Sequence, residues 1–276
     1  MPGLNADVAP FAKLVDALDP WLGQVVLVGG WAHRLYRLDS RARTLPYLPL
    51  TTLDGDVAVP ATLKVEASSL RDRLLKAGFK EEFIGEDRPP ATHYHYGQVG
   101  GFYVEFLSPL VGSEYDRRGK RKATREVGGV SSQQLRYIEI LLVEPWKIVL
   151  SKKAGYPFAQ AKKMLMANPT SFLAQKILIH HERDYEERAK DLLYIHDTIE
   201  MFSEHLDDLQ RIYVTDLQPR LHHNRKADLR NAARQLFGKV TDTIREAALM
   251  AAGRRLNPEA LSQTGGAGLE AIFGKK

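Results

Sequence analysis

The chain has 276 residues, of which 44% are hydrophobic and 26% charged, an ordinary globular composition with enough chain for one large or two modest domains. It contains no cysteine, which excludes disulfides and any zinc or iron–sulfur site held by thiolates. The net charge of +5 and a pI of about 9.2 hint at a polyanionic partner without establishing one. The N-terminus lacks signal-peptide regions and no stretch approaches about 18 apolar residues, so we expect a cytoplasmic protein that does not enter a membrane.

Short strand patterns are interspersed with helical patterns up to about residue 168. Helical spacing occurs at 11–18, 31–38 and 68–79, and strand patterns occur at 24–30, 53–60, 92–98, 101–108, 136–145 and 146–151. Segments 92–98 and 101–108 flank a pair of glycines and are typical of a hairpin. Hairpins interspersed with helices predict an α+β fold with a mixed sheet.

From Asn168 onward the pattern is helical. Asn168 is expected to cap a helix that begins with proline, and Asp184 is expected to cap the next one. The glycine-rich tail, residues 261–276, is expected to fray. We therefore predict a sheet-containing domain over residues 1–165 and a helical domain over residues 166–276.

Two carboxylates lie one residue apart in the strand pattern "TTLDGDVAVP". Because side chains alternate along a strand, Asp54 and Asp56 share one face, with Cβ atoms about 7 Å apart, and repel each other. A divalent metal is the usual partner that offsets such repulsion. Glu105 interrupts the otherwise apolar strand "GFYVEFL" in the same way. If the two strands are neighbours, three carboxylates converge, as two-metal phosphoryl transfer requires.

A simpler interpretation of these acids remains open. Asp-Gly is a common turn dipeptide, so residues 53–56 also fit a solvated hairpin turn, and Glu105 also fits an exposed strand position. The preceding segment favours the functional interpretation. In "VVLVGGWAHRLYRL" a strand leads through Gly29 and Gly30 into a helix, and glycines allow a phosphate close to the backbone.

The combination of "LVGGWA", "TLDGDV" and "YVEFL" resembles the nucleotidyltransferase fold (DNA polymerase β-like) superfamily. Residues 168–199 are similar to the second conserved region of the bacterial AbiEii-like nucleotidyltransferase toxins, and Thr52 fits the T-x-D-x-D pattern of that group. The resemblance covers roughly residues 22–200. It implies a nucleotidyltransferase-type mixed sheet in the N-terminal domain, followed by the helical domain.

The resemblance implies an enzyme that transfers a nucleoside monophosphate from an NTP to a hydroxyl of RNA, for example at a tRNA 3′ end, or of a protein. It further implies Mg²⁺ or Mn²⁺ as cofactor, a toxin-like role and an antitoxin partner. The implied metal ligands are Asp54, Asp56 and Glu105. The implied catalytic set adds Lys176 and Asp191, and the implied nucleotide-binding residues are Gly29, Gly30, Thr52, Lys176, Arg183 and Lys190.

Alternatives stay open for several of these residues. Lys176 also fits a surface lysine on an amphipathic helix, and Asp191 an ordinary helix-surface acid. Gly55 stands where the family has an apolar residue, and the span 39–50 before the aspartates is long. A catalytically degenerate module that binds nucleotide or nucleic acid is therefore the second hypothesis. A protein whose acids merely decorate a turn is the third.

A basic cluster follows the Glu105 strand. The simpler interpretation of this cluster is a solvated loop, and the functional interpretation is a surface that binds RNA phosphates. The predicted nucleic-acid-binding residues in this cluster are Arg117, Arg118, Lys120, Arg121 and Lys122. The histidines lack metal-ligand spacing, and we expect His93 and His95 to be surface or stacking residues.

Overall fold

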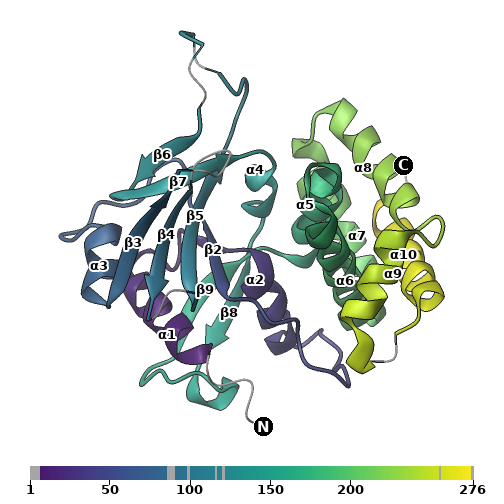
Figure 1. The fold of residues 1–276 in the computed structure, drawn as a ribbon, viewed down its shortest axis with the longest axis horizontal. Helices are drawn as coiled ribbons and strands as arrows, with labels where there is room; N and C mark the ends of the chain where they lie inside the picture. Colours follow the sequence, from purple (N-terminus) through teal and green to yellow (C-terminus); the bar gives the residue numbers. More distant parts are fainter. Residues whose placement is uncertain are drawn as a thin grey trace. The chain divides into compact units, whose positions relative to one another are not determined.

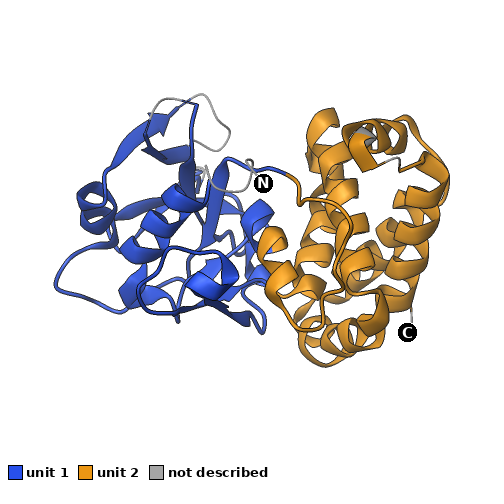
Figure 2. Cartoon of the chain, turned by 90° about the horizontal axis from the view of Figure 1, so that it is seen from below, with its two compact units in different colours: residues 1–32, 51–167 blue, residues 33–50, 168–276 orange. Residues whose placement is uncertain are grey.

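The computed structural model describes residues 7–85, 91–97, 100–115, 117–119, 122–254 and 256–274. It divides into two compact units, residues 1–32 with 51–167 and residues 33–50 with 168–276 (Figure 2). The predicted α+β class is confirmed, with a mixed sheet in the first unit and a helical C-terminal region. Segment 33–50 belongs to the helical unit, although it precedes most of the sheet in sequence. Within the described part of the chain, no helix has the length and apolarity that a membrane span needs.

The first unit is built on a nine-stranded mixed sheet (Figure 1). Its strands are β1 (Val26–Leu27), β2 (Asp54–Ala58), β3 (Phe79–Ile84), β4 (Ala91–Tyr96), β5 (Tyr103–Pro109), β6 (Thr124–Val127), β7 (Val130–Leu135), β8 (Trp146–Leu150) and β9 (Lys162–Met166). The order is β3-β4-β5-β2-β1-β9-β8, with β7 also pairing to β5 and β6 pairing to β7. Strand β2 is parallel to β5, so the strands that carry the acidic motifs are direct neighbours.

Helices pack on both faces of this sheet. Helix α1 (Val8–Ala17) lies on the face to which Gly55 belongs, where Leu14 approaches that glycine, and α3 (Leu70–Lys76) lies beside β3. On the other face, Ile138 and Leu141 of α4 (Ile138–Leu141) pack against Ala58 and Leu107. Ala58 lies two residues after Asp56, and Leu107 two residues after Glu105, on the same face of the sheet. Helix α4 therefore covers the acid-bearing face towards the carboxyl-terminal ends of β2 and β5.

The prediction of a strand at residues 136–145 is wrong, because the apolar residues of this segment form the short helix α4. A short apolar run fits a strand and a buried helix equally well, and here packing of residues three apart against the sheet decides for helix. The β6–β7 hairpin was not predicted. Its two-residue turn consists of Gly128 and Gly129, both with positive φ, which is a typical hairpin signal.

The second unit is helical. Its α-helices are α5 (Pro169–Ile179), α6 (Tyr185–Met201), α7 (Leu206–Ile212), α8 (His223–Leu236), α9 (Asp242–Met250) and α10 (Pro258–Phe273), and α2 (Gly29–Leu35) crosses from the first unit into the second. The predicted caps are confirmed: Asn168 accepts a hydrogen bond from the Ser171 amide, and Asp184 accepts one from the Glu187 amide. Capping by these side chains sets where α5 and α6 begin.

The prediction that the glycine-rich tail frays is wrong. The tail belongs to α10, which packs against α6, α8 and α9. Its glycines permit this packing. A Cβ at Gly265 would lie 2.6 Å from the Phe237 ring, and one at Gly268 would lie 2.3 Å from Ile199. Local sequence alone suggested disorder because glycine weakens isolated helices, whereas close helix packing rewards it here.

Gly268→Ala should lower the free energy of unfolding by about 1–3 kcal/mol, because the added methyl group overpacks against Ile199. Gly266→Ala on the same helix is the matched control, since its Cβ would lie an ordinary 3.5 Å from Phe237. The control should gain up to about 1 kcal/mol from helix propensity. Urea unfolding of both variants checks this, and equal stabilisation of the two would contradict close packing at Gly268.

Candidate active site

Asp54 and Asp56 lie on β2, and Glu105 lies on the neighbouring strand β5. In the parallel register, Asp54 is opposite Tyr103 and Asp56 is opposite Glu105. Residues that are opposite in a sheet point to the same face, so the three carboxylates share one face of the sheet. The hairpin-turn interpretation of residues 53–56 is wrong, because both aspartates belong to a strand.

The glycine pair that follows β1 packs against the acidic strand. Gly29 has φ +62°, and a Cβ on it would lie 1.9 Å from Asp56 Oδ2. A Cβ on Gly30 would lie 2.8 Å from the side chain of Thr52, whose hydroxyl donates to Asp54. Both positions need glycine because β2 and the residues before it occupy the space of a side chain. The turn backbone therefore lies directly beside the carboxylates.

Gly55, the departure from the family pattern, sits in a regular part of β2. It pairs in register with Val104, between the flanking aspartates. A Cβ on it would lie 3.0 Å from Phe102 and 3.3 Å from Leu14. The Phe102 ring thus fills the place of the usual apolar side chain, and the strand that holds the aspartates stays paired on both sides of the glycine.

His93 and His95 lie on β4 beside this face, and each approaches an acid. His93 Nε2 is 2.5 Å from Glu105 Oε1, and its ring stacks on Tyr103 with centroids 4.5 Å apart. His95 Nε2 is 2.8 Å from Glu82 Oε2. The expectation of stacking is confirmed for His93, but neither histidine is a plain surface residue, since each side chain is only 15% exposed. Pairing with acids escaped sequence reasoning because it depends on strand register.

Lys176 and Asp191 form a buried ion pair in the helical unit. Lys176 Nζ donates to Asp191 Oδ1 at 2.6 Å, and Asp191 has no exposed surface. The ammonium lies 5.7 Å from the ring centroid of Phe172 and 5.4 Å from that of Tyr194. The surface-residue alternatives for both members of the pair are therefore wrong, because Asp191 is fully buried and the Lys176 side chain is only 9% exposed.

The other two predicted nucleotide-binding cations flank this pair. Arg183 Nε lies 3.5 Å from Asp191 Oδ2, and its Nη2 donates to Glu187. Lys190 Nζ lies 3.7 Å from Glu187 Oε1. The charged side chains of residues 176–191 thus form one network of ion pairs within the second unit. This network neutralises the buried Asp191 carboxylate.

Comparison with protein families adds the decisive observation. A family model described as nucleotidyltransferase matches residues 6–217 of the chain. The chain belongs to this nucleotidyltransferase family. The match includes both the sheet that carries the acids and the helices that carry Lys176 and Asp191, and it shows that the protein is a nucleotidyltransferase enzyme. A comparison with curated proteins found no match.

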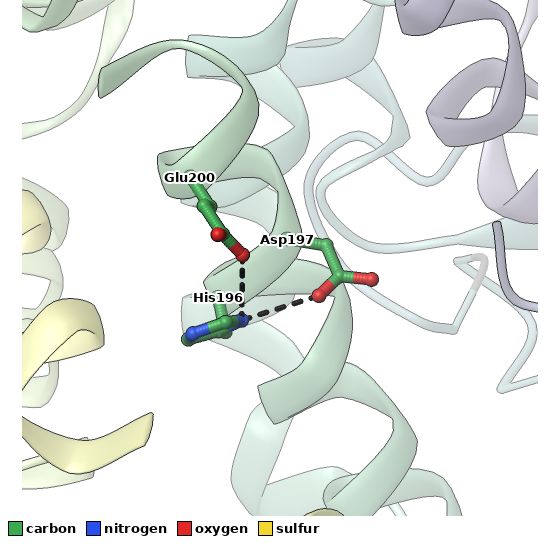
Figure 3. Close-up of side chains that lie close together, drawn as sticks. All are labelled: His196, Asp197 and Glu200. Carbon is green, nitrogen blue, oxygen red and sulfur yellow. Dashed lines mark hydrogen bonds and ion pairs between the residues drawn. The ribbon is translucent and has the colours of Figure 1, made fainter. Parts of the chain in front are cut away.

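The described part of this nucleotidyltransferase contains one set of three His, Asp or Glu residues whose ligand atoms all lie within 4.8 Å of one another. It consists of His196, Asp197 and Glu200 on α6 (Figure 3). His196 Nδ1 is 3.2 Å from Asp197 Oδ1 and 4.0 Å from Glu200 Oε2. The set has ligands that suit a divalent ion, and sequence analysis did not single it out.

Both acids of this set already have partners other than His196. Arg254 Nη1 lies 2.8 and 2.6 Å from the two oxygens of Asp197, and the Tyr47 hydroxyl donates to Glu200 at 2.5 Å. A metal ion at Asp197 would compete with the guanidinium of Arg254. We therefore interpret the set as structural: through Tyr47, its two acids hold segment 33–50 against α6.

The basic loop leaves β5 at its carboxyl-terminal end, whereas Tyr103 and Asp54 pair at the amino-terminal end. Arg117 and Arg118 are exposed and Lys122 is partly exposed. Lys120 and Arg121 lie outside the described residues. The role of this loop in nucleic-acid binding stays a prediction.

His33 is fully buried in the helical unit, and within the described residues neither ring nitrogen has a hydrogen-bond partner. Its ring packs against Phe172 and Tyr194. Burial lowers the pKa of His33 to about 4, against a smaller opposing effect of the Asp197 charge. The folded protein therefore holds this imidazole neutral at pH values where the unfolded chain protonates it.

Acidification should destabilise the protein through His33. Between pH 6.5 and 4 the unfolded chain binds more protons than the folded one, so stability present above pH 6.5 is lost as pH falls, by up to about 3 kcal/mol. Urea unfolding of the wild type and of His33→Phe across this range measures the contribution. The difference between the two curves isolates His33 from His180, whose pKa burial also lowers to about 4. Parallel curves would contradict the assignment.

Proposed function

We propose that this nucleotidyltransferase transfers a nucleoside monophosphate from an NTP to a hydroxyl group of RNA, with divalent metal ions bound at Asp54, Asp56 and Glu105. The observation that carries the proposal is the register of β2 and β5. It sets Asp56 opposite Glu105, and Gly29 packs directly against the Asp56 carboxylate. Carboxylates and a close-approaching glycine turn are what binding of a metal-complexed triphosphate needs.

The donor set fits Mg²⁺ or Mn²⁺, because three carboxylates supply the hard oxygen ligands these ions prefer. Bound there, the ions would neutralise the triphosphate and lower the pKa of the acceptor hydroxyl. Glu105 would take the hydroxyl proton as the oxygen bonds to the α-phosphorus and the bond to pyrophosphate breaks. The amides of Gly29 and Gly30 would hold the β- and γ-phosphates.

In the helical unit, Lys176 is the proposed phosphate-binding cation. The hydrogen bond to Asp191 supports a role for that acid in orienting the ammonium. Arg183 and Lys190 are proposed as further contacts to the nucleotide. A compact ammonium held in place by a buried carboxylate acts on phosphates as a point charge and needs no reorganisation during the reaction.

RNA is proposed as the acceptor because the chain has a net charge of +5 and carries the exposed Arg117 and Arg118. Phosphate contacts of this kind make binding fall steeply with salt. The finer proposal of a tRNA 3′ end rests on the resemblance to AbiEii-like toxins.

The test incubates the purified protein with Mg²⁺, each α-³²P-labelled NTP and total cellular RNA, beside the double variant Asp54→Ala/Asp56→Ala. Label that enters RNA with the wild type alone supports the proposal and identifies the nucleotide. In a parallel reaction with lysate, label that enters protein would show that the acceptor is a protein and not RNA. Absence of label from both would favour the second hypothesis, a degenerate module that binds nucleotide.

A toxin-like role with an antitoxin partner is proposed on the same resemblance. Induced expression of the wild type in bacteria should arrest growth, and expression of the double aspartate variant at the same level should not. Equal growth of the two cultures would argue against a toxin.

A further inference from the structure

The segment "THYHY" places two imidazoles on the acid-bearing face of the sheet. Strand β4 is antiparallel to β5, with Tyr94 opposite Val104 and His95 opposite Tyr103. One step along this register, His93 comes next to Glu105 on the same face. Neither histidine has a part in the proposed transfer reaction.

His93 is held from two sides. Its Nε2 lies 2.5 Å from Glu105 Oε1, and its ring stacks on Tyr103 with an interplanar angle of 21°. Tyr103 is itself opposite Asp54 in the register. The imidazole therefore has little rotational freedom, and the carboxylate next to it is restrained in turn.

We propose that His93 is a positioning residue that holds the Glu105 carboxylate in the orientation needed to share a metal ion with the aspartates; this rests on the function proposed above. A glutamate side chain has three rotatable bonds, and an imidazole nitrogen held 2.5 Å from one carboxylate oxygen restricts the rotamers that the side chain can adopt. Groups that orient metal-binding carboxylates in this way commonly control metal affinity.

His95 provides an internal comparison. Its ring lies near the same Tyr103, with centroids 5.5 Å apart, and it too approaches an acid. That acid is Glu82 on the edge strand β3, whose side chain is 52% exposed. The two histidines are thus equally exposed and both contact Tyr103, although only His93 stacks on that ring. They also differ in whether the paired acid belongs to the proposed metal site.

Three variants separate positioning from packing. His93→Phe keeps the ring on Tyr103 and removes the nitrogens, His93→Gln keeps an N–H group and removes the ring, and His95→Phe is the matched control. For each, kcat and KM for the NTP are measured, together with the Mn²⁺ dissociation constant from the electron paramagnetic resonance signal of free Mn²⁺. We expect His93→Phe to lower kcat and Mn²⁺ affinity by about 10–100-fold with a smaller change in KM.

His93→Gln should recover most of the loss, and His95→Phe should stay within about twofold of the wild type. In the double variant His93→Phe/Glu105→Gln, Mn²⁺ affinity should equal that of Glu105→Gln alone, because the histidine acts through Glu105. Wild-type affinity in His93→Phe, or an equal loss in His95→Phe, would overturn the proposal.

The Mn²⁺ measurement keeps this test apart from the proposed function. If the wild type transfers no nucleotide to any acceptor, the transferase proposal fails, and Mn²⁺ affinity still decides the role of His93. If the wild type does not bind Mn²⁺, both proposals fall.

Discussion

Asp56→Asn should reduce nucleotide transfer by about 10³-fold or more, since the carboxylate lies at the centre of the proposed metal site and loss of the metal ions removes several kcal/mol of stabilisation from the transition state. Folding should survive, because asparagine has nearly the same shape and the change removes one of three negative charges from a shared face. Initial rates with saturating NTP and Mg²⁺ measure the loss of activity, and urea unfolding checks that the variant still folds.

Glu82→Gln is the matched control for Asp56→Asn. Glu82 lies on the same sheet and pairs with His95, but it is half exposed at the edge strand. Its rate should stay within about twofold of the wild type, because a surface ion pair contributes little. A variant Asp56→Asn that retains a tenth or more of the wild-type rate would remove Asp56 from the metal site.

Lys176→Met should lower the free energy of unfolding by about 3–5 kcal/mol, because it leaves the buried Asp191 without its closest cation. Arg183, at 3.5 Å, is the remaining cation near that carboxylate among the described residues. Urea unfolding measures the loss. A loss below about 1 kcal/mol would mean that Arg183 alone compensates Asp191.

The double variant Lys176→Met/Asp191→Leu separates a structural from a catalytic role of this pair. Replacing both charges by apolar groups should bring stability back to within about 1 kcal/mol of the wild type. If Lys176 acts on the triphosphate, this double variant should be stable and yet transfer nucleotide at least about 100-fold more slowly than the wild type. A stable and active double variant would leave the pair with a structural role alone.

Much of the secondary structure follows from local patterns. The caps Asn168 and Asp184 were predicted because a capping side chain bonds to an amide three residues away, which is a local event. The strand at 136–145 and the frayed tail were mispredicted for the opposite reason. Whether Ile138 packs on a sheet, and whether Gly268 lies against Ile199, depends on residues far away in the chain.

The candidate site shows the same division. Its residue types and their spacing, an acid pair after a glycine turn and a third acid in a later strand, are readable from the chain, and the family match agrees with the activity they imply. The burial of Lys176 was not readable, because lysine is rarely buried without a partner and its partner Asp191 lies on another helix. Nor was the filling of the Gly55 position by Phe102.

The sequence by itself determined that Asp54 and Asp56 point to the same side, because alternation along a strand is a property of the local backbone. It also indicated a turn at Gly29 and Gly30 between a strand and a helix, because glycine allows a close approach to the backbone that other residues block. Only the tertiary structure decided that Glu105 stands opposite Asp56 and that His93 stands beside Glu105. Strand order and register are set by which distant segments bury their apolar faces together, and no local pattern contains that choice.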